Sequence, residues 1–94
     1  MTRFKPGDLC HVSIQQGGGG FMYELPMAVI KNGQPYYKVD AAGYVEYLPV
    51  DSTEFDVMIL MPFDGKGKFV RYVVLYQESL ILVHDEDLKK VGES

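Results

Sequence analysis

The sequence predicts a single all-β domain, and three observations support that prediction. Short runs of β-branched and aromatic residues alternate with Gly, Pro, Asn and Asp, as in strands joined by turns. Signals for helices are nearly absent. The chain has 94 residues, 47% of them hydrophobic and 13% aromatic, which suffices for one core but not for two. The same composition excludes a disordered chain.

The first strand is expected over residues 8–14, after a turn at residues 5–8. Strand alternation places Cys10, Val12 and Ile14 on one face and the intervening residues on the other. Residues 15–20 include four consecutive glycines and offer few side chains for packing. They therefore predict a loop.

Three strands are expected in the middle of the chain, over residues 27–31, 36–39 and 44–48. The first two form a hairpin, because Asn32-Gly33 readily takes the positive φ angles of a tight turn. Residues 34–35 widen its loop, and residues 41–43 form the next turn. Residues 51–54 have the composition of one helical turn, after which strand character returns.

Three further strands are expected over residues 57–61, 69–76 and 80–83. The first of them is apolar on both faces, which predicts a central, buried strand. Residues 64–67 link it to the second strand as a hairpin. Residues 85–90 predict a short terminal helical turn, with acids at its start and lysines at its end to suit the helix dipole.

Pro6-Gly7-Asp8 opens the first strand, a long irregular segment follows it, and residues 72–76 and 80–88 form a hairpin that runs into a short turn. This order resembles the small barrels of the Src-homology and KOW type, and its closing part resembles small barrel proteins encoded by tailed bacteriophages. The resemblance implies a Src-homology-like barrel over residues 1–94, with residues 32–56 inserted as a hairpin or long loop. It also implies binding of a macromolecule rather than catalysis.

The chain carries 13 Asp and Glu against 9 Lys and Arg, a net charge of -4 that argues against broad binding to phosphate backbones. Residues 39–65 contain no Lys or Arg, which predicts an acidic surface region. No apolar run reaches the length of a membrane span, no signal-peptide pattern is visible and the chain has one cysteine. We therefore expect a soluble protein of the bacterial cytoplasm.

The motifs for chemistry are weak. Cys10 and His11 are adjacent, and adjacent strand residues face opposite ways, so they cannot act as nucleophile and base. His84, Asp85 and Asp87 lack the spacing of metal ligands, and the glycine run lacks the Lys-Ser or Lys-Thr of a phosphate loop. We therefore expect a buried Cys10, no catalytic site, no metal and no cofactor.

The seven tyrosines, with no tryptophan, are the most informative feature. Tyrosine combines a large apolar ring with a hydrogen-bonding hydroxyl, which suits contact surfaces. Tyr72 and Tyr76 fit an ordinary core, whereas on a strand either Tyr36 or Tyr37 must face away from it. The sequence predicts a partner-binding surface made of Tyr36, Tyr37, Asp40, Tyr44, Glu46 and Tyr47.

Three functions follow as hypotheses. The leading one is a non-enzymatic, phage-encoded protein that binds a macromolecule, a protein first of all, through this aromatic and acidic surface, and forms a homodimer or higher oligomer through edge strands. The second is an oligomer that sequesters a nucleotide-type ligand, with phosphate held by Lys66, Lys68 or Arg71. The third is a KOW-like RNA- or DNA-binding module that uses the same cations.

Overall fold

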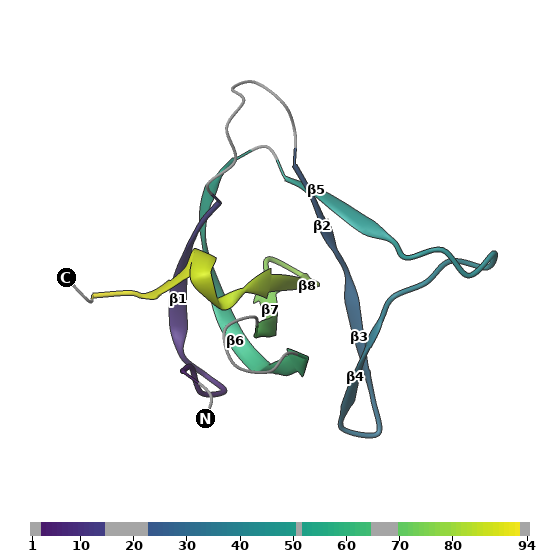
Figure 1. Ribbon diagram of the computed structural model, residues 1–94, viewed down its shortest axis with the longest axis horizontal. Helices are drawn as coiled ribbons and strands as arrows, with labels where there is room; N and C mark the ends of the chain where they lie inside the picture. Colours follow the sequence, from purple (N-terminus) through teal and green to yellow (C-terminus); the bar gives the residue numbers. More distant parts are fainter. Residues whose placement is uncertain (1–2, 15–22, 51, 65–69, 93–94) are drawn as a thin grey trace.

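The computed structural model describes residues 3–14, 23–50, 52–64 and 70–92 (Figure 1). Strands and one 3-10 turn follow one another in this part of the chain as β1 (Leu9–Ser13), β2 (Tyr23–Pro26), β3 (Ala28–Lys31), β4 (Gln34–Tyr37), β5 (Tyr47–Val50), β6 (Glu54–Asp64), β7 (Arg71–Tyr76), β8 (Ser79–His84), η1 (Asp85–Asp87) and β9 (Leu88–Lys90). The all-β prediction is confirmed.

The main sheet has five antiparallel strands in the order β8-β7-β6-β1-β9. The eleven-residue β6 lies at its centre, as the apolar run 57–61 predicted. Its register with β7 shifts between Ile59 and Met61 and again between Pro62 and Asp64, and such bulges bend a strand. Strands β8 and β9 end the sheet on its two sides, so the described strands do not close into a barrel.

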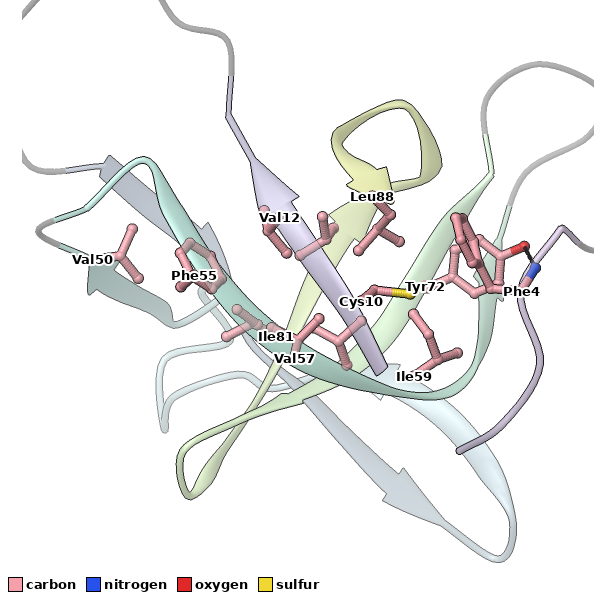
Figure 2. Close-up of a cluster of buried hydrophobic side chains, with 12 residues drawn as sticks. Phe4, Cys10, Val12, Val50, Phe55, Val57, Ile59, Tyr72, Ile81 and Leu88 are labelled. Atoms are coloured by element: carbon pink, nitrogen blue, oxygen red, sulfur yellow. Dashed lines mark hydrogen bonds between the residues drawn. The ribbon is translucent and has the colours of Figure 1, made fainter. Parts of the chain in front are cut away.

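The inner face of this sheet, defined as the face that carries Cys10 and Val12, holds the main hydrophobic core (Figure 2). The predicted alternation of the first strand is confirmed, because Cys10 and Val12 are fully buried while Leu9 is exposed. The core side chains come from the N-terminal segment and from six strands: Phe4, Cys10, Val12, Val50, Phe55, Val57, Ile59, Tyr72, Val74, Ile81, Val83 and Leu88.

Residues 23–50, which hold β2 to β5, form an insert between β1 and β6. It begins earlier and ends earlier than the predicted insert 32–56. Strand β2 pairs with β5 and β3 with β4, and Met27 between β2 and β3 bridges to Ile81 of the edge strand β8. Figure 1 shows that the β3–β4 hairpin and the segment between β4 and β5 run in different directions from the place where Met27 meets β8.

The insert packs on both faces of the main sheet. Leu25, Met27 and Leu48 contact the inner core, whereas Ala28 packs with Val73 and Leu82 on the outer face. The continuous run β2–β3 therefore crosses the edge of β8 and places one strand pair on each side. Sequence alternation alone does not reveal such a crossing, because it depends on which edge the run meets.

Four local predictions need correction. Residues 34–35 belong to β4 and do not widen the loop, because Asn32 and Gly33 alone supply the positive φ angles of the turn. The strand expected at 44–48 is β5 at Tyr47–Val50, whose Val50 fills the core. Glu54 begins β6 instead of ending a helical turn. Residues 88–90 are strand β9, since Leu88 enters the core and pairs with Val12.

Candidate functional site

All six residues of the predicted partner-binding surface lie in the insert, and five of them are exposed. Tyr44 is 71% exposed, Tyr36 and Tyr47 are each 51% exposed, and Glu46 is half-buried. Tyr72 is buried and Tyr76 packs against the core, as expected for those two tyrosines. The structure thus places Tyr72 and Tyr76 in or against the core, and it exposes four tyrosines on one segment: Tyr36, Tyr37, Tyr44 and Tyr47.

Tyr36 and Tyr37 face opposite sides of the β3–β4 hairpin, as the sequence required. Tyr37 is the register partner of Ala28, whose methyl group is buried against the main sheet. The Tyr37 ring packs edge-on against Phe63 of β6, with 4.9 Å between the ring centroids. Tyr36 pairs with Val29 and points away from the sheet. Tyr36 is therefore available for contact, whereas Tyr37 holds the hairpin to the sheet.

Arg71 of β7 completes this attachment. Its Nε donates a 2.9 Å hydrogen bond to Asp64 Oδ1, and its Nη2 donates to Asp64 Oδ2 and, over 2.5 Å, to the Tyr37 hydroxyl. The guanidinium also lies over the rings of Tyr37 and Phe63, 5.4 and 5.1 Å from their centroids. The hydrogen bond from Arg71 lowers the pKa of the Asp64 carboxyl, and the same pair raises the pKa of Arg71.

Three chain segments meet at Met27, Lys38 and Glu46, which lie just outside the strands of the insert. The Met27 N–H donates to the Glu46 carbonyl over 2.9 Å, the Lys38 N–H donates to the Met27 carbonyl over 2.9 Å, and the Glu46 N–H donates to the Lys38 carbonyl over 2.8 Å. Lys38 Nζ also lies 3.8 Å from Glu46 Oε2. This junction fixes the directions in which the two branches of the insert leave the sheet, and it pairs the Glu46 carboxylate within the chain.

Beyond the junction, residues 39–45 form a small turn that we call the tip. Val39 and Val45 form an antiparallel bridge at its base. Asp40 Oδ1 accepts hydrogen bonds from the N–H groups of Ala42 and Tyr44, at 2.9 and 3.0 Å, and Gly43 adopts a positive φ of 89°. The backbone of the tip is therefore tied by its own hydrogen bonds, while the Tyr44 side chain lies in solvent.

The prolines of the insert occupy positions that leave its strand ladders intact. Lys38 and Glu46 make hydrogen-bonded pairs with Met27. Hydrogen-bonded and non-hydrogen-bonded pairs alternate along antiparallel strands, so Pro35, Pro26 and Pro49 fall in non-hydrogen-bonded pairs. Their nitrogens then point away from the paired strand. A missing N–H at these positions removes no hydrogen bond within the insert, and it disfavours the pairing of another strand at that edge.

The predicted anion-binding residues are only partly described. Lys66 and Lys68 lie outside the described residues, as does the glycine run 17–20. The Arg71 charge is compensated by Asp64. Arg71 also lines a cavity of about 220 Å³ with Leu25, Pro26, His84 and others, which is below the roughly 300–1,000 Å³ common for ligand pockets. The nucleotide and nucleic-acid hypotheses thus gain no support from Arg71.

The structure places Cys10 and His11 on opposite faces of the main sheet, as strand alternation predicted. Cys10 is fully buried, and His11 lies on the opposite face, where its Nδ1 is 2.8 Å from Asp56 Oδ1 and its Nε2 is 3.3 Å from Glu54 Oε1. These two carboxylates raise the pKa of His11. Burial raises the pKa of Asp87, the last residue of η1. Among the described residues, no three His, Cys, Asp or Glu side chains gather as a metal site would require.

The sequence did not identify Phe63, Asp64 and Arg71 as the residues that hold the insert in place. The opposite charges of Asp64 and Arg71, seven positions apart across the link between β6 and β7, were the available signal.

No helix within the described ranges has the length and apolarity to cross a membrane. Comparison with known proteins gives no match to a family model, to a curated protein or to a solved structure.

Proposed function

We propose that the protein is a non-enzymatic binding module that captures a protein partner through the exposed aromatic surface of its insert. One observation carries the proposal. Of the eight large hydrophobic residues that are exposed in the described part of the chain, six lie between residues 30 and 47: Ile30, Tyr36, Tyr37, Val39, Tyr44 and Tyr47. Exposed apolar groups gathered on one segment mark contact surfaces, and tyrosine is enriched at their centres.

The way in which Tyr44 is held supports the same conclusion. The backbone N–H groups of Ala42 and Tyr44 donate hydrogen bonds to Asp40, which orders the tip without burying its aromatic side chain. A ring held on an ordered turn loses little conformational entropy when a partner covers it, so more of the contact energy is available for binding. In this proposal Tyr36, Tyr44 and Tyr47 contact the partner, and Asp40 is a positioning residue.

The acidic part of the predicted surface contributes less than the tyrosines. Glu46 is paired with Lys38, and Asp40 accepts two backbone hydrogen bonds. Partially compensated carboxylates of this kind help to select a partner more than they increase affinity. We therefore expect the affinity to depend weakly on salt, in contrast to the steep dependence of a nucleic-acid-binding module.

The framework that carries the insert is, in this proposal, an open variant of the small barrels of the Src-homology type, because its described strands do not close. Three features support it: the Pro-Gly-Asp turn before β1, the position of β1 between β6 and β9, and the 3-10 turn that separates β8 from the last strand. The bend of β6 at its two register shifts turns the sheet around its core. Such a framework would act as a rigid base for the insert.

The test is a capture experiment with immobilised protein and bacterial lysate, followed by calorimetry with the purified partner. The variant Tyr44→Ala/Tyr47→Ala should lose the partner while keeping the β-sheet circular dichroism spectrum. Val91→Ala, which changes an equally exposed apolar residue outside the insert, is the matched control and should retain capture. Unchanged capture by the double variant would overturn the proposal, and heat released with a panel of nucleotides would favour the ligand-sequestering alternative.

A further inference from the structure

A row of apolar side chains crosses the outer face of the main sheet, on the opposite side from the core. Register partners carry it from strand to strand: Leu9 pairs with Met58, Met58 with Leu75, and Leu75 with Leu80. Val91 extends the row beyond β9, since its N–H donates a 3.0 Å hydrogen bond to the Leu9 carbonyl. The β8 end of the row packs in the outer cluster with Ala28, but Leu9 and Val91 are 61% and 55% exposed.

A charged row runs beside the apolar one. His11 of β1 is the register partner of Lys89 on the neighbouring strand β9 and of Asp56 on the neighbouring strand β6. Lys89 and Asp56 therefore lie at the same height along β1, on its two sides. All three side chains share the outer face with Leu9. The β9 side of this face is therefore positive, and its β6 side, which carries Asp56 and Glu54, is negative.

The described strand edges of the insert and of β9 are poor sites for association. The described edges of the insert carry Pro26, Pro35 and Pro49 at positions without an available N–H. The β9 edge has three residues, two of them lysines, so a second β9 placed against it would bring like charges together. These edges therefore disfavour self-association, and the outer face of the main sheet is the surface to consider for it.

We propose that the outer face of β9, β1 and β6 binds the same face of a second copy of this chain, about a two-fold axis parallel to β1. Such an axis exchanges the β9 side with the β6 side at the same height. It places Leu9 against the second Leu9 and Val91 against the second Met58. It also places Lys89 of each copy against Asp56 of the other, so both ion pairs form at once. In this orientation Lys89 is complementary to Asp56 of the other copy, while the two His11 side chains meet on the axis.

The contact is small, because three strands spaced about 4.8 Å apart form it. Its buried area falls in the class below about 1,200 Å² that is typical of weak complexes. We therefore expect a reversible dimer with a dissociation constant on the order of 100 µM. Because the tyrosines of the insert take no part, this dimer is independent of the proposed partner-binding function.

Sedimentation analysis of the full chain over a wide concentration range tests the proposal. The wild-type protein should shift from monomer to dimer, and Leu9→Lys should raise the dissociation constant by more than about tenfold, since two lysines would then meet on the axis. Tyr44→Ala is the control for the insert and should dimerise as the wild type does. A wild-type chain that stays monomeric near 1 mM, or a Leu9→Lys variant that dimerises unchanged, overturns the proposal.

The orientation is tested by two single variants that are then mixed. Lys89→Glu and Asp56→Lys should each weaken self-association by about tenfold, because each places like charges at both contacts. The mixture should form a heterodimer, since the carboxylate introduced by one variant then meets the ammonium introduced by the other at one contact, and the native pair forms at the second contact. If no heterodimer forms while both variants keep the wild-type circular dichroism, the proposed axis is wrong. Should Asp56→Lys fail to fold, the Leu9→Lys result alone decides.

Discussion

Arg71 Nη2 donates a hydrogen bond of 2.5 Å to the hydroxyl of Tyr37, a residue 34 positions earlier in the chain. Arg71 belongs to the main sheet and Tyr37 to the insert, so this bond joins the rigid framework to the segment that carries the exposed tyrosines. Asp64 orients the guanidinium from the other side. Together with the junction at Met27, this cation therefore holds the β3–β4 hairpin, and with it Tyr36, in position.

Arg71→Ala is expected to lower the free energy of unfolding by about 1–3 kcal/mol, because it removes hydrogen bonds to a charged group and leaves Asp64 without its partner. Tyr37→Phe keeps the ring contact with Phe63 and removes only the hydroxyl, so its loss should be about 0.5–1.5 kcal/mol. Urea denaturation measures both values. A larger loss for Tyr37→Phe than for Arg71→Ala would contradict this account of the attachment.

Asp40→Ala is expected to loosen the tip without unfolding the domain, because the carboxylate bonds only to the backbone of Ala42 and Tyr44. Hydrogen exchange at those two amides should accelerate, and partner affinity should fall by about tenfold as the ordering cost moves to the binding step. Asp40→Asn is the matched control, since an amide oxygen also accepts these bonds. If Asp40→Asn weakens binding as much as Asp40→Ala, the charge matters and the positioning role is wrong.

The parts of the fold that the sequence predicted are those in which local pattern and tertiary environment agree. In β1, alternation alone places Cys10 inside and His11 outside, and in β6 the apolar run marks the central strand. The Asn32-Gly33 turn was predictable because few residue pairs accept two positive φ angles. Strand alternation likewise established that one of Tyr36 and Tyr37 faces away from the sheet.

The missed parts depend on contacts between distant residues. Strand β2 escaped prediction because Tyr23–Pro26 is short and ends in proline, and it exists only through its pairing with β5. Strand β9 carries the charge pattern of a helix end, yet burial of Leu88 and pairing with β1 outweigh that pattern. The attachment of the hairpin by Arg71 depends on Tyr37, 34 positions earlier, and no local signal relates Tyr37 to the Asp64–Arg71 pair.

Tyr72→Phe is expected to destabilise the domain by about 1–3 kcal/mol, although it removes a single oxygen. The Tyr72 hydroxyl accepts hydrogen bonds from the backbone N–H groups of Arg3 and Phe4, at 3.0 and 3.3 Å. The Phe4 ring packs edge-on against the Tyr72 ring (Figure 2). Without that oxygen, at least the buried Phe4 N–H loses its partner. Tyr76→Phe is the control, because its hydroxyl has only a long 3.5 Å contact with Gln77, and thermal unfolding should barely change.

The His11 cluster should make stability depend on pH near neutrality. Asp56 first and Glu54 second raise the pKa of His11 above 6.5, because their carboxylates bind the protonated imidazole more tightly than the neutral one. The folded state therefore binds the proton more strongly than the unfolded state. The resulting stabilisation is fully present below about pH 6.5 and is lost as the pH rises through the folded-state pKa.

A nuclear magnetic resonance titration of the His11 ring protons should accordingly give a midpoint above 6.5. Asp56→Asn should lower that midpoint further than Glu54→Gln does, because the 2.8 Å hydrogen bond to Asp56 is the larger cause. His11→Gln should remove the decline in unfolding free energy over the same pH interval, which denaturation at a series of pH values would measure. A midpoint at or below 6.5 in the wild-type protein would mean that the two carboxylates do not hold the imidazole in solution. Because both carboxylates are exposed, added salt should move the midpoint back toward 6.5, and a salt-insensitive midpoint would point to a different cause of the shift.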